Sequence, residues 1–582
     1  MTCRWILRPV PSEDAVKDIG QQLNNLPEAL SRALILRGVD TFDSARAFFR
    51  PGISGLHDPF LMADMHAASD RVAQAIRDKE RIVVYGDYDV DGTTASALLV
   101  SSLRSLGGDV GFFVPNRFEH GYGLSRSGLD EAARLGARLI VAVDCGVTAS
   151  EEARYAREKG MDLVVCDHHT PKGELPDAEA VVDPKRTDCP YPFKELAGCG
   201  IAFKLLQGVL VKLERDPEAA TEFLDLVAVA TASDMVPVED ENRILLALGL
   251  ERLRQKPSSG LRALAAVANI SLPSCTASEV VFRMAPRINA AGRMSTAEKA
   301  IDLLLAEDPA TAEHCAKELD TLNTYRREID QKTLEAATKL AERQITSKMR
   351  HTLVLHHNDW FPGVIGIVAS RLVERFHRPT ILLGTIDGVA TGSARSIGGI
   401  NIFEALRECE DLLVKFGGHA FAAGLSLEIS NLPALQERFD EAVGKVVTPE
   451  VLQPSIQVDA LLPLHEIDRR FLAVLKQFEP FGPGNDRPVF QANRLLPVRP
   501  PRKVGKDNQH LKFVVRPQEQ SEKGSPLEVI GFGMGGRFDI LEQCLQEQQP
   551  FDMLFSVKEN FWNGHTQTQL QAKDIRRSAP PA

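Results

Sequence analysis

The chain has 582 residues, 44% of them hydrophobic and 25% charged, a mix that is typical of soluble globular proteins and excludes collagen-like, mucin-like and wholly disordered chains. Its formal net charge of −11 excludes a uniformly basic nucleic-acid binder but leaves room for a local basic groove. No apolar run approaches the ~20 residues that a membrane-spanning helix needs, so no membrane association is expected.

The N-terminus has no continuous apolar segment, and we expect no signal peptide. The nine cysteines are scattered, and no pair has the spacing C-x-x-C. A disulfide framework or a zinc ribbon is therefore not expected, and the predicted location is a reducing cytoplasm. At about 150 residues per domain, the length predicts three to four domains.

The first two regions differ in pattern. Residues 1–70 carry short amphipathic pieces and turn residues, and we expect an N-terminal extension. Residues 71–240 alternate helix-like segments with short, unalternated apolar runs, which are typical of strands buried on both faces of a parallel sheet. These runs lie at 82–85, 111–114, 139–143, 163–166 and 180–182. The region is predicted to be α/β.

The rest of the chain changes pattern twice. Residues 241–349 are expected to be helical, with a long connecting helix over 310–348, a stretch without Gly or Pro in which we allow for one break. Residues 350–445 return to a smaller α/β pattern. Residues 450–577 contain a Pro-rich stretch and then short strands with turns, which predict a C-terminal all-β domain such as an OB-like barrel.

The C-terminal region also carries a basic stripe. Between residues 494 and 516 there are seven basic residues and one acidic residue, Asp507, with His510 and Phe513 interleaved. An OB-like barrel with such a stripe would follow the backbone of a single nucleic-acid strand. The competing interpretation is an ordinary solvated face.

Acidic residues follow the strands of the first α/β region. They occur in the segments Asp87–Asp91, Asp144–Gly146, Asp167–His169 and Asp183–Pro184. In an open parallel sheet, ligands bind beyond the carboxyl ends of the strands, and neighbouring strands lie about 4.8 Å apart. We therefore expect several carboxylates to converge in one small volume.

Converging carboxylates repel one another, and the pKa of each rises unless a cation neutralises them. Aspartates with one or two histidines suit Mn²⁺ or Mg²⁺ better than a structural zinc. Two ions about 3.5–4 Å apart would clamp the attacking and leaving oxygens of a phosphoryl transfer. A further acid, Asp234, follows the apolar helix expected at 223–232, where the helix dipole disfavours a lone carboxylate unless a metal binds it.

Each of these features also has a structural interpretation. A lone D-x-D is usually a solvated turn, Asp144 could cap a helix, and His168 or His169 could be a structural histidine. The joint pattern of acids at several strand ends beside a histidine pair favours the metal site.

The same residues resemble a known family. The segments YGDYDVDG (85–92), VDCG (143–146) and DHH (167–169) resemble the motifs of the DHH phosphoesterases. Further segments resemble the branch of that family formed by bacterial single-strand-specific 5′→3′ exonucleases, at 115–124, 283–294, 363–369 and 417–424. The resemblance covers about residues 50–577. It implies a parallel-sheet DHH domain and a smaller α/β DHHA1 domain joined by a long helix, followed by the OB-like domain.

The resemblance also implies roles for single residues. Two metal ions would be held by Asp89, Asp91, Asp144, His168 and Asp234, with Asp144 bridging and Asp87 as an accessory acid. His169 would face the scissile phosphate, and Asp91 and Asp144 would take part in catalysis with it. A terminal 5′-phosphate would be bound by Arg117, Ser393 and Arg395. The expected DNA contacts are Tyr122, Arg287, His419, Arg502, Lys503 and Lys506.

The implied activity is a two-metal exonuclease that degrades single-stranded DNA from the 5′ end to 5′-mononucleotides, in recombinational and mismatch repair. The implied partners are single-strand-binding protein and a repair helicase, and the implied state is a monomer in the cytoplasm, associated with the nucleoid during repair. Two alternatives stay open: a DHH phosphodiesterase for oligoribonucleotides or cyclic dinucleotides, and an inactive single-strand-binding scaffold.

Overall fold

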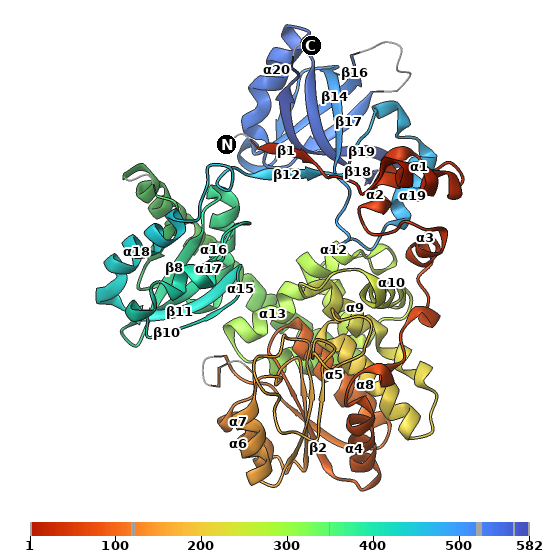
Figure 1. Cartoon of the computed structure of the whole chain (residues 1–582), viewed down its shortest axis with the longest axis vertical. Coiled ribbons are helices and arrows are strands. Elements are labelled where there is room, and N and C mark those ends of the chain that lie inside the picture. The colour runs from red at the N-terminus through yellow and green to blue at the C-terminus, as the bar shows by residue number, and fades with distance from the viewer. Residues whose placement is uncertain are drawn as a thin grey trace. The chain divides into compact units, whose positions relative to one another are not determined.

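The computed structural model describes residues 3–117, 120–121, 123–347, 350–518, 526–562 and 565–579 (Figure 1). Contacts divide the chain into two compact units. The larger unit contains residues 57–236 and 248–454, and the smaller unit contains residues 3–56, 237–247 and the chain from Ser455 onward. Among the described residues, no helix combines the length and the apolar character needed to cross a bilayer.

The N-terminal part of the larger unit is built on a five-stranded sheet with the order β3-β2-β4-β5-β6. All of its pairings are parallel, which confirms the predicted sheet. Its strands are β2 (Arg81–Gly86), β3 (Asp109–Phe113), β4 (Leu139–Val143), β5 (Asp162–Cys166) and β6 (Ala180–Val182). The strand order reverses at β2, which has β3 on one side and β4 on the other, so the carboxyl ends of β2 and β4 form a topological switch point.

Helices cover both faces of this sheet. One face packs against α6 (Arg126–Arg134) and α7 (Ser150–Glu158), and the other faces α4 (Met65–Arg77), α5 (Val90–Ser105) and α8 (Gly198–Lys212) (Figure 1). Val83 and Tyr85 of β2 lie in one hydrophobic cluster with Leu129 of α6 and Ala156 of α7. Because both faces are buried, the strands carry the unalternated apolar runs seen in the sequence.

The segment after the first sheet is helical, as predicted. Its helices are α9 (Leu224–Ser233), α10 (Asp240–Gln255), α11 (Ser259–Val267), α12 (Ala277–Glu279), α13 (Ala285–Met294), α14 (Glu298–Leu305) and α15 (Pro309–Ser347). Helix α15 runs for 39 residues without the break that we allowed for. Its buried Asp330 pairs with Arg371 at 3.2 Å, which fixes it to the helix α16 (Pro362–Phe376).

A second sheet with the order β10-β11-β9-β8-β7 follows the long helix. Only β7 and β8 pair in parallel. The elements are β7 (Leu353–His356), α16 (Pro362–Phe376), β8 (Thr380–Ile386), β9 (Val389–Arg395), α17 (Ile402–Arg407), β10 (Lys415–Gly418), β11 (Ala422–Glu428) and α18 (Leu432–Gly444). This is the smaller α/β domain that the sequence predicted.

In the smaller unit the strand pairings β14–β18–β19–β17–β16–β14 close on themselves, as an OB-like barrel requires. The strands are β12 (Ser455–Val458), β13 (Ala460–Leu461), β14 (Phe490–Pro497), β15 (Arg502–Val504), β16 (His510–Pro517), β17 (Leu527–Gly531), β18 (Phe551–Trp562) and β19 (His565–Arg577). The buried rings of Phe490, Phe513, Phe551 and Phe555 fill its core.

Two details of this unit differ from the expectation of an all-β region with short strands. Helices α19 (Arg469–Gln477) and α20 (Phe538–Gln546) are present, because their apolar residues recur at helical spacing, as with the buried Leu541 and Cys544. Strands β18 and β19 have 12 and 13 residues and form one long hairpin.

The N-terminal segment is part of the same unit. It contains β1 (Arg4–Leu7), α1 (Glu13–Gln22), α2 (Glu28–Ile35) and α3 (Phe42–Phe49). Strand β1 pairs in parallel with β12, and the Trp5 indole donates a hydrogen bond to Asp574 of β19 at 2.9 Å. Residues 3–56 are therefore packed into the C-terminal domain.

Candidate metal centre

The loop after β2 is shaped by its own aspartates. Asp89 caps α5: its Oδ1 accepts hydrogen bonds from the backbone N–H groups of Asp91 at 2.8 Å and Gly92 at 3.1 Å. A Cβ at Gly92 would lie 2.5 Å from the backbone of Asp87, so the tight turn requires glycine. Asp89 is therefore a helix cap, which does not exclude a metal on its other carboxylate oxygen.

Asp91 is held from a distant part of the chain. Its two carboxylate oxygens accept hydrogen bonds from the backbone N–H groups of Gly198 at 2.6 Å and Cys199 at 2.7 Å, the first residues of α8. A helix N-terminus stabilises a carboxylate there. A Cβ at Gly198 would lie 2.8 Å from the Cβ of Asp144, so the same glycine lets two acids approach one another.

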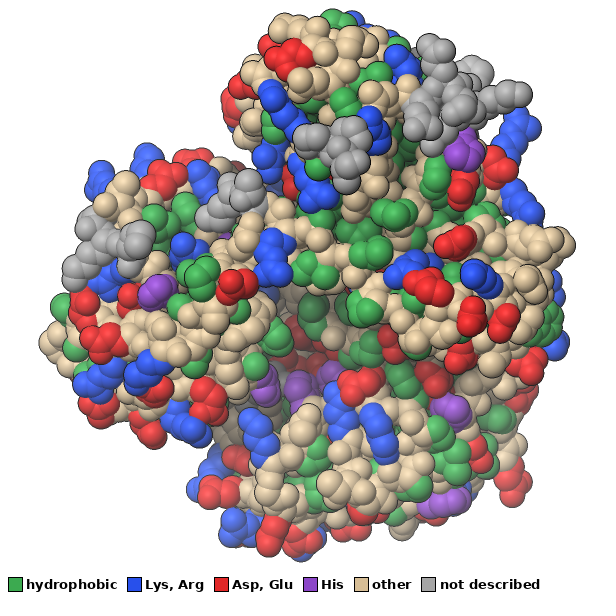
Figure 2. Space-filling view, turned by 45° about the horizontal axis from the view of Figure 1, so that its top comes forward, with side chains coloured by type: hydrophobic (Ala, Val, Ile, Leu, Met, Phe, Trp, Pro, Cys, Tyr) green, Lys and Arg blue, Asp and Glu red, His purple; other side chains and the backbone are tan. Residues whose placement is uncertain are grey.

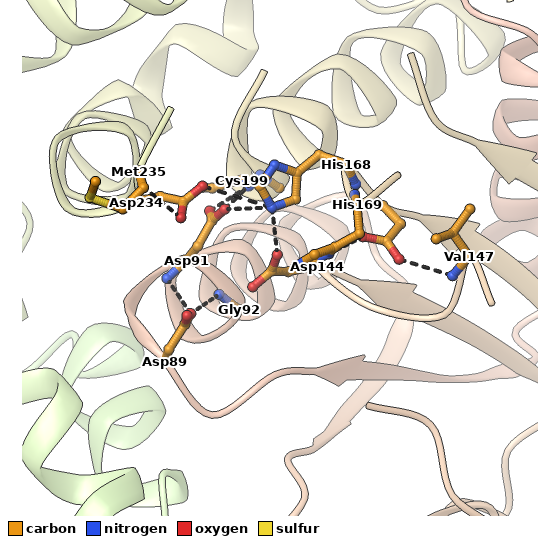
Figure 3. Close-up of polar contacts among 12 residues, drawn as sticks. Asp89, Asp91, Gly92, Asp144, Val147, His168, His169, Cys199, Asp234 and Met235 are labelled. Atoms are coloured by element: carbon orange, nitrogen blue, oxygen red, sulfur yellow. Dashed lines mark hydrogen bonds and ion pairs between the residues drawn. The ribbon is translucent and has the colours of Figure 1, made fainter. Parts of the chain in front are cut away.

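His168 lies among three carboxylates (Figure 3). Its Nε2 is 3.1 Å from Oδ1 of Asp144, 3.9 Å from Oδ2 of Asp91 and 3.8 Å from Oδ2 of Asp234. Asp144 follows β4 with a φ of +59°, a strained conformation for a residue with a side chain and one that recurs at functional sites. The structure thus brings together acids from the ends of β2, β4 and α9 around one imidazole.

Three groups of side chains could each hold a cation, since their ligand atoms lie within 4.8 Å of one another. The groups are Asp91 with His168 and Asp234, Asp87 with Asp89 and Asp144, and Asp144 with His168 and His169. Asp144 is shared by two groups, which is the arrangement that a bridging ligand needs.

The charges of this cluster are unbalanced. Burial raises the pKa of Asp87, Asp91 and Asp144 well above the usual value, and the charges of neighbouring aspartates raise it further. Within the described part of the chain, Oδ1 of Asp87, Nδ1 of His168 and Oδ2 of Asp234 are buried without a hydrogen-bond partner. Oxygen-rich donors with one imidazole and unmet negative charge fit a hard divalent cation.

Asp167 positions the second histidine rather than joining the cluster of acids. Its Oδ1 lies 2.7 Å from Nδ1 of His169, and its Oδ2 accepts a hydrogen bond from the backbone of Val147 at 2.9 Å. Burial lowers the pKa of His169, but the hydrogen bond and the charge of Asp167 outweigh burial and raise it to about 9. Asp167 therefore orients His169 and favours its protonated form.

Arginines border the acids. The Arg117 guanidinium lies over the ring of Tyr88, 4.4 Å from its centroid, and its charge acts on Asp87. Arg293 is largely buried and donates from Nη1 to the Gly363 carbonyl at 3.2 Å. Burial lowers the pKa of Arg293 to about 10, and the charge of Arg117 contributes.

The predicted 5′-phosphate residues of the second sheet lie on one face of β9. A Cβ at Gly366 of α16 would be 2.8 Å from Nη2 of Arg395 and 3.3 Å from Oγ of Ser393, so both side chains face this helix. Burial alone lowers the pKa of Arg395, and no carboxylate partner is found for it among the described residues. His419 is exposed in the turn between β10 and β11, and Ala422 of β11 pairs with Arg395.

Comparison with known proteins identifies the domains. The DHH family N-terminal domain matches residues 81–231, the DHHA1 domain matches 345–445 and the RecJ OB domain matches 458–574. The chain is 39% identical over 574 residues to the single-stranded-DNA-specific exonuclease RecJ of Bacillus subtilis, covering 98% of this chain and 70% of that protein. It is also 39% identical to the protein of the same name in Salmonella typhimurium, covering 95% of this chain and 96% of the other. This chain belongs to the RecJ family of single-stranded-DNA-specific exonucleases.

Solved structures agree with this assignment. RecJ of Thermus thermophilus in complex with Mn²⁺ superposes with a TM-score of 0.83 at 31% identity, covering 100% of this chain and 80% of the other. The complex of the same protein with Mg²⁺ gives a TM-score of 0.76 at 30% identity, covering 100% of this chain and 79% of the other. Members of the family thus bind the two cations predicted from the sequence, and the acid groups of this chain can hold such ions.

Two predicted DNA contacts need comment. Tyr122 lies outside the described residues. Arg287 is mostly buried, with Nη2 2.8 Å from Asp320 of α15, and this ion pair fixes α13 to the long helix. On the same helix, six residues further on, the pKa of Arg293 is lowered by burial and by the charge of Arg117, and the charge of Asp89 acts in the opposite direction. The sequence motif 283–294 marked this helix but did not show which arginine faces the acids.

Some basic residues of the C-terminal stripe pair with an acid, and others are exposed. Arg502, Lys503 and Lys506 are exposed on β15 and the turn that follows it. Glu528 pairs with both Arg499 and Lys512, at 3.2 and 3.1 Å. On the face shown in Figure 2, basic and acidic side chains are interspersed. A phosphate-binding track on this domain would therefore rest on β15 and its turn.

Proposed function

We propose that this chain hydrolyses single-stranded DNA from the 5′ end to 5′-mononucleotides and uses Mn²⁺ or Mg²⁺ as a cofactor. Membership of the RecJ family supports the substrate class. The observation that carries the chemistry is the cluster in which Nε2 of His168 lies 3.1 Å from Oδ1 of Asp144, among buried carboxylates whose pKa is raised by burial and by one another.

The proposed ligands of two ions are the residues that the cluster brings together. They are Asp89, Asp91, Asp144, His168 and Asp234, with Asp144 between the two sites and Asp87 as an accessory acid. Divalent ions bound there supply an activated water and positive charge for the phosphate oxygens. The protein contributes fixed positions, since the α8 N-terminus holds Asp91 and the left-handed backbone aims Asp144.

His169 is proposed to act on the leaving group. Its orientation is fixed by Asp167, and the charge of that acid favours the protonated imidazole. A protonated imidazole beside the acids can stabilise negative charge on the phosphate and give its proton to the departing 3′-oxygen. The phosphodiester P–O bond to the 3′-oxygen breaks as water oxygen bonds to phosphorus, and the released nucleotide keeps the 5′-phosphate.

The direction of digestion is proposed to come from arginines. Arg395 and Ser393 share one face of β9, and a half-buried guanidinium that pairs with no carboxylate among the described residues fits a dianionic terminal phosphate. Arg117 lies by the acid cluster over Tyr88, where it can hold a second phosphate oxygen. A strand whose 5′ end is held there would present its first internucleotide bond to the metal centre.

The biological role is proposed from the family alone. It comprises recombinational and mismatch repair, with single-strand-binding protein and a repair helicase as partners of a monomer. The described cysteines are free thiols, which supports a reducing cytoplasm as the location.

Digestion of long single strands labelled at the 5′ or the 3′ end, with matched duplexes and with or without Mn²⁺, tests the proposal. We expect metal-dependent release of labelled mononucleotide at once from 5′-labelled strands and only late from 3′-labelled ones. Early release from the 3′ label would contradict the direction, and activity only on di- or trinucleotides would favour the small-substrate alternative. Binding without hydrolysis in Mn²⁺ would favour the inactive scaffold.

A further inference from the structure

A cavity of about 560 Å³ opens beside the long helix of the larger unit, away from the residues assigned above. Its lining includes Tyr325 and Lys332 of α15, His357 and Trp360 of the β7–α16 connection, and Met294 at the end of α13. The volume lies within the range of sites that hold a small organic ligand, about 300–1,000 Å³.

The lining has the chemistry of a stacking site. The rings of His357 and Trp360 stack with centroids 5.8 Å apart and planes inclined by 26°. Tyr325 is 56% exposed and the His357 side chain is 50% exposed, whereas Trp360 is 5% exposed and belongs to the hydrophobic core. Flat rings that are partly open to solvent bind nucleobases by stacking, whatever the base.

The lining carries an acid, Asp359, whose Oδ2 lies 3.9 Å from Nδ1 of His357, and a cation, Lys332. Lys332 lies seven residues after Tyr325 on the same helix, which places the two side chains on one face. The side chain of Lys332 is exposed and can meet a phosphate while aromatic rings contact the base. A nucleotide unit has both parts, a flat ring and an anion.

A short stretch of α13 lies between the cavity and the metal centre. Gly292 packs against the D-x-D loop, since a Cβ there would lie 2.6 Å from the carbonyl oxygen of Tyr88. Arg293 donates to the carbonyl of Gly363 in the first turn of α16, and the next residue, Met294, lines the cavity. The end of α13 therefore forms a wall between the acid cluster and the aromatic pocket.

We propose that this aromatic pocket is a nucleobase-binding subsite, in which one base of the single-stranded substrate stacks against the exposed rings of Tyr325 and His357, the latter backed by Trp360, while Lys332 meets its phosphate. The inference rests on the proposed single-strand nuclease function and adds a specific contact beyond the cleaved nucleotide. The same chemistry could come from the released mononucleotide, and the experiment separates the two sources.

The test measures equilibrium binding of 5′-phosphorylated, fluorescently labelled single strands in the absence of divalent metal, with one abasic site moved along the strand. We expect one abasic position to weaken binding to the parent protein by roughly 5- to 150-fold, the effect of losing one stacked base. Tyr325→Ala should weaken binding of the intact strand by a similar factor and remove the penalty at that abasic position. Tyr325→Phe keeps the ring and should restore parental behaviour.

A second pair of variants tests the cation. Lys332→Gln should weaken binding several-fold, whereas Lys339→Gln, on the same helix but outside the pocket lining, should not. The subsite would be overturned if Tyr325→Ala and each abasic site weakened strand binding independently, so that their fold-losses simply multiplied at every position. If Tyr325→Ala lost the binding of dAMP but bound the intact strand as the parent protein does, the pocket would be a product site, and the subsite would again be overturned. If the parent protein binds and digests no single strand, the proposed function fails instead, and the two failures are thereby distinguished.

Discussion

The candidate residues of the two α/β sheets in the larger unit differ in the sign of their charge. The first sheet collects buried carboxylates whose pKa is raised by burial and by one another. The second sheet half-buries Arg395, for which no carboxylate partner is found in the part of the chain that the structure describes. Each arrangement is costly in isolation, because an uncompensated buried charge is unfavourable. One region needs cations and the other needs an anion, and a 5′-phosphorylated strand with divalent metal would satisfy both.

The largest expected effect comes from the carboxylate shared between two ligand groups. Asp144→Ala should lower the turnover of single-stranded DNA by roughly 10³-fold or more, since losing even one contact that stabilises the transition state costs about 10²–10³. Strand binding without metal should survive, because the phosphate contacts remain. Asp177→Ala, an exposed acid of the same domain, serves as the control. Parental turnover in Asp144→Ala would remove the bridging role.

The anion site of the second sheet should give the next largest effect. Arg395→Ala should abolish a preference for 5′-phosphate over 5′-hydroxyl ends. On 5′-phosphorylated strands kcat/KM should fall by roughly 10- to 150-fold, because one hydrogen-bonded charge pair contributes about 1.5–3 kcal/mol. Rates on 5′-hydroxyl strands should change little. Arg407→Ala, an exposed arginine that pairs with Glu404, is the matched control. A parent protein that cuts both ends equally would show that the pocket is wrongly assigned.

A smaller effect is expected from Tyr88, whose ring contacts the Arg117 guanidinium beside the acid cluster. Tyr88 supports the Arg117 guanidinium with its ring at 4.4 Å. Tyr88→Leu should lower kcat/KM by about 2- to 30-fold, the range of a cation–π contact of 0.5–2 kcal/mol. Tyr88→Phe keeps the ring and should lose much less. Equal losses in the two variants would show that the ring face does not position Arg117.

The smallest effect should come from the basic stripe of the C-terminal domain. Arg502→Gln should lower the slope of log binding constant against log salt by about 1, as expected for one lost phosphate contact. Lys512→Gln should change the slope less, because Glu528 already lies 3.1 Å from Lys512. Salt titrations of strand binding in the absence of metal compare the two. A larger change for Lys512 would contradict the choice of β15 as the track.

The parts of the site that follow from local rules could be predicted from sequence. Short apolar runs indicated a parallel sheet, and the acids after β2 and β4 and the histidines after β5 had to meet at its carboxyl edge. The supports of those acids depend on tertiary packing. Nothing near Asp91 in the sequence shows that Gly198 and Cys199, more than a hundred residues away, hold its carboxylate.

The sequence also did not determine which side chains of a helix face the site. The motif 283–294 contains three arginines, and sequence reasoning chose Arg287, which the structure ties to Asp320. The charge of Asp89 affects the pKa of Arg293, and the direction of each side chain depends on how α13 packs against α15 and the D-x-D loop. Asp167 was likewise visible in the DHH motif, but its hold on His169 became clear only from the geometry.

Thermal unfolding of the metal-free protein with increasing Mn²⁺ tests the central claim that divalent cations balance the acid cluster. Because the folded-state pKa of Asp87, Asp91 and Asp144 is raised, the folded state holds extra protons, and their contribution to stability falls as the pH rises above the unfolded value of about 3.9. Mn²⁺ should therefore raise the unfolding temperature, more at pH 8 than at pH 6, with about 2.7 kcal/mol per site at a hundredfold excess over Kd. Asp144→Asn should keep or raise the metal-free unfolding temperature and lose most of this gain. An unfolding temperature that does not respond to Mn²⁺ at either pH, or a gain that Asp144→Asn retains in full, would contradict the account.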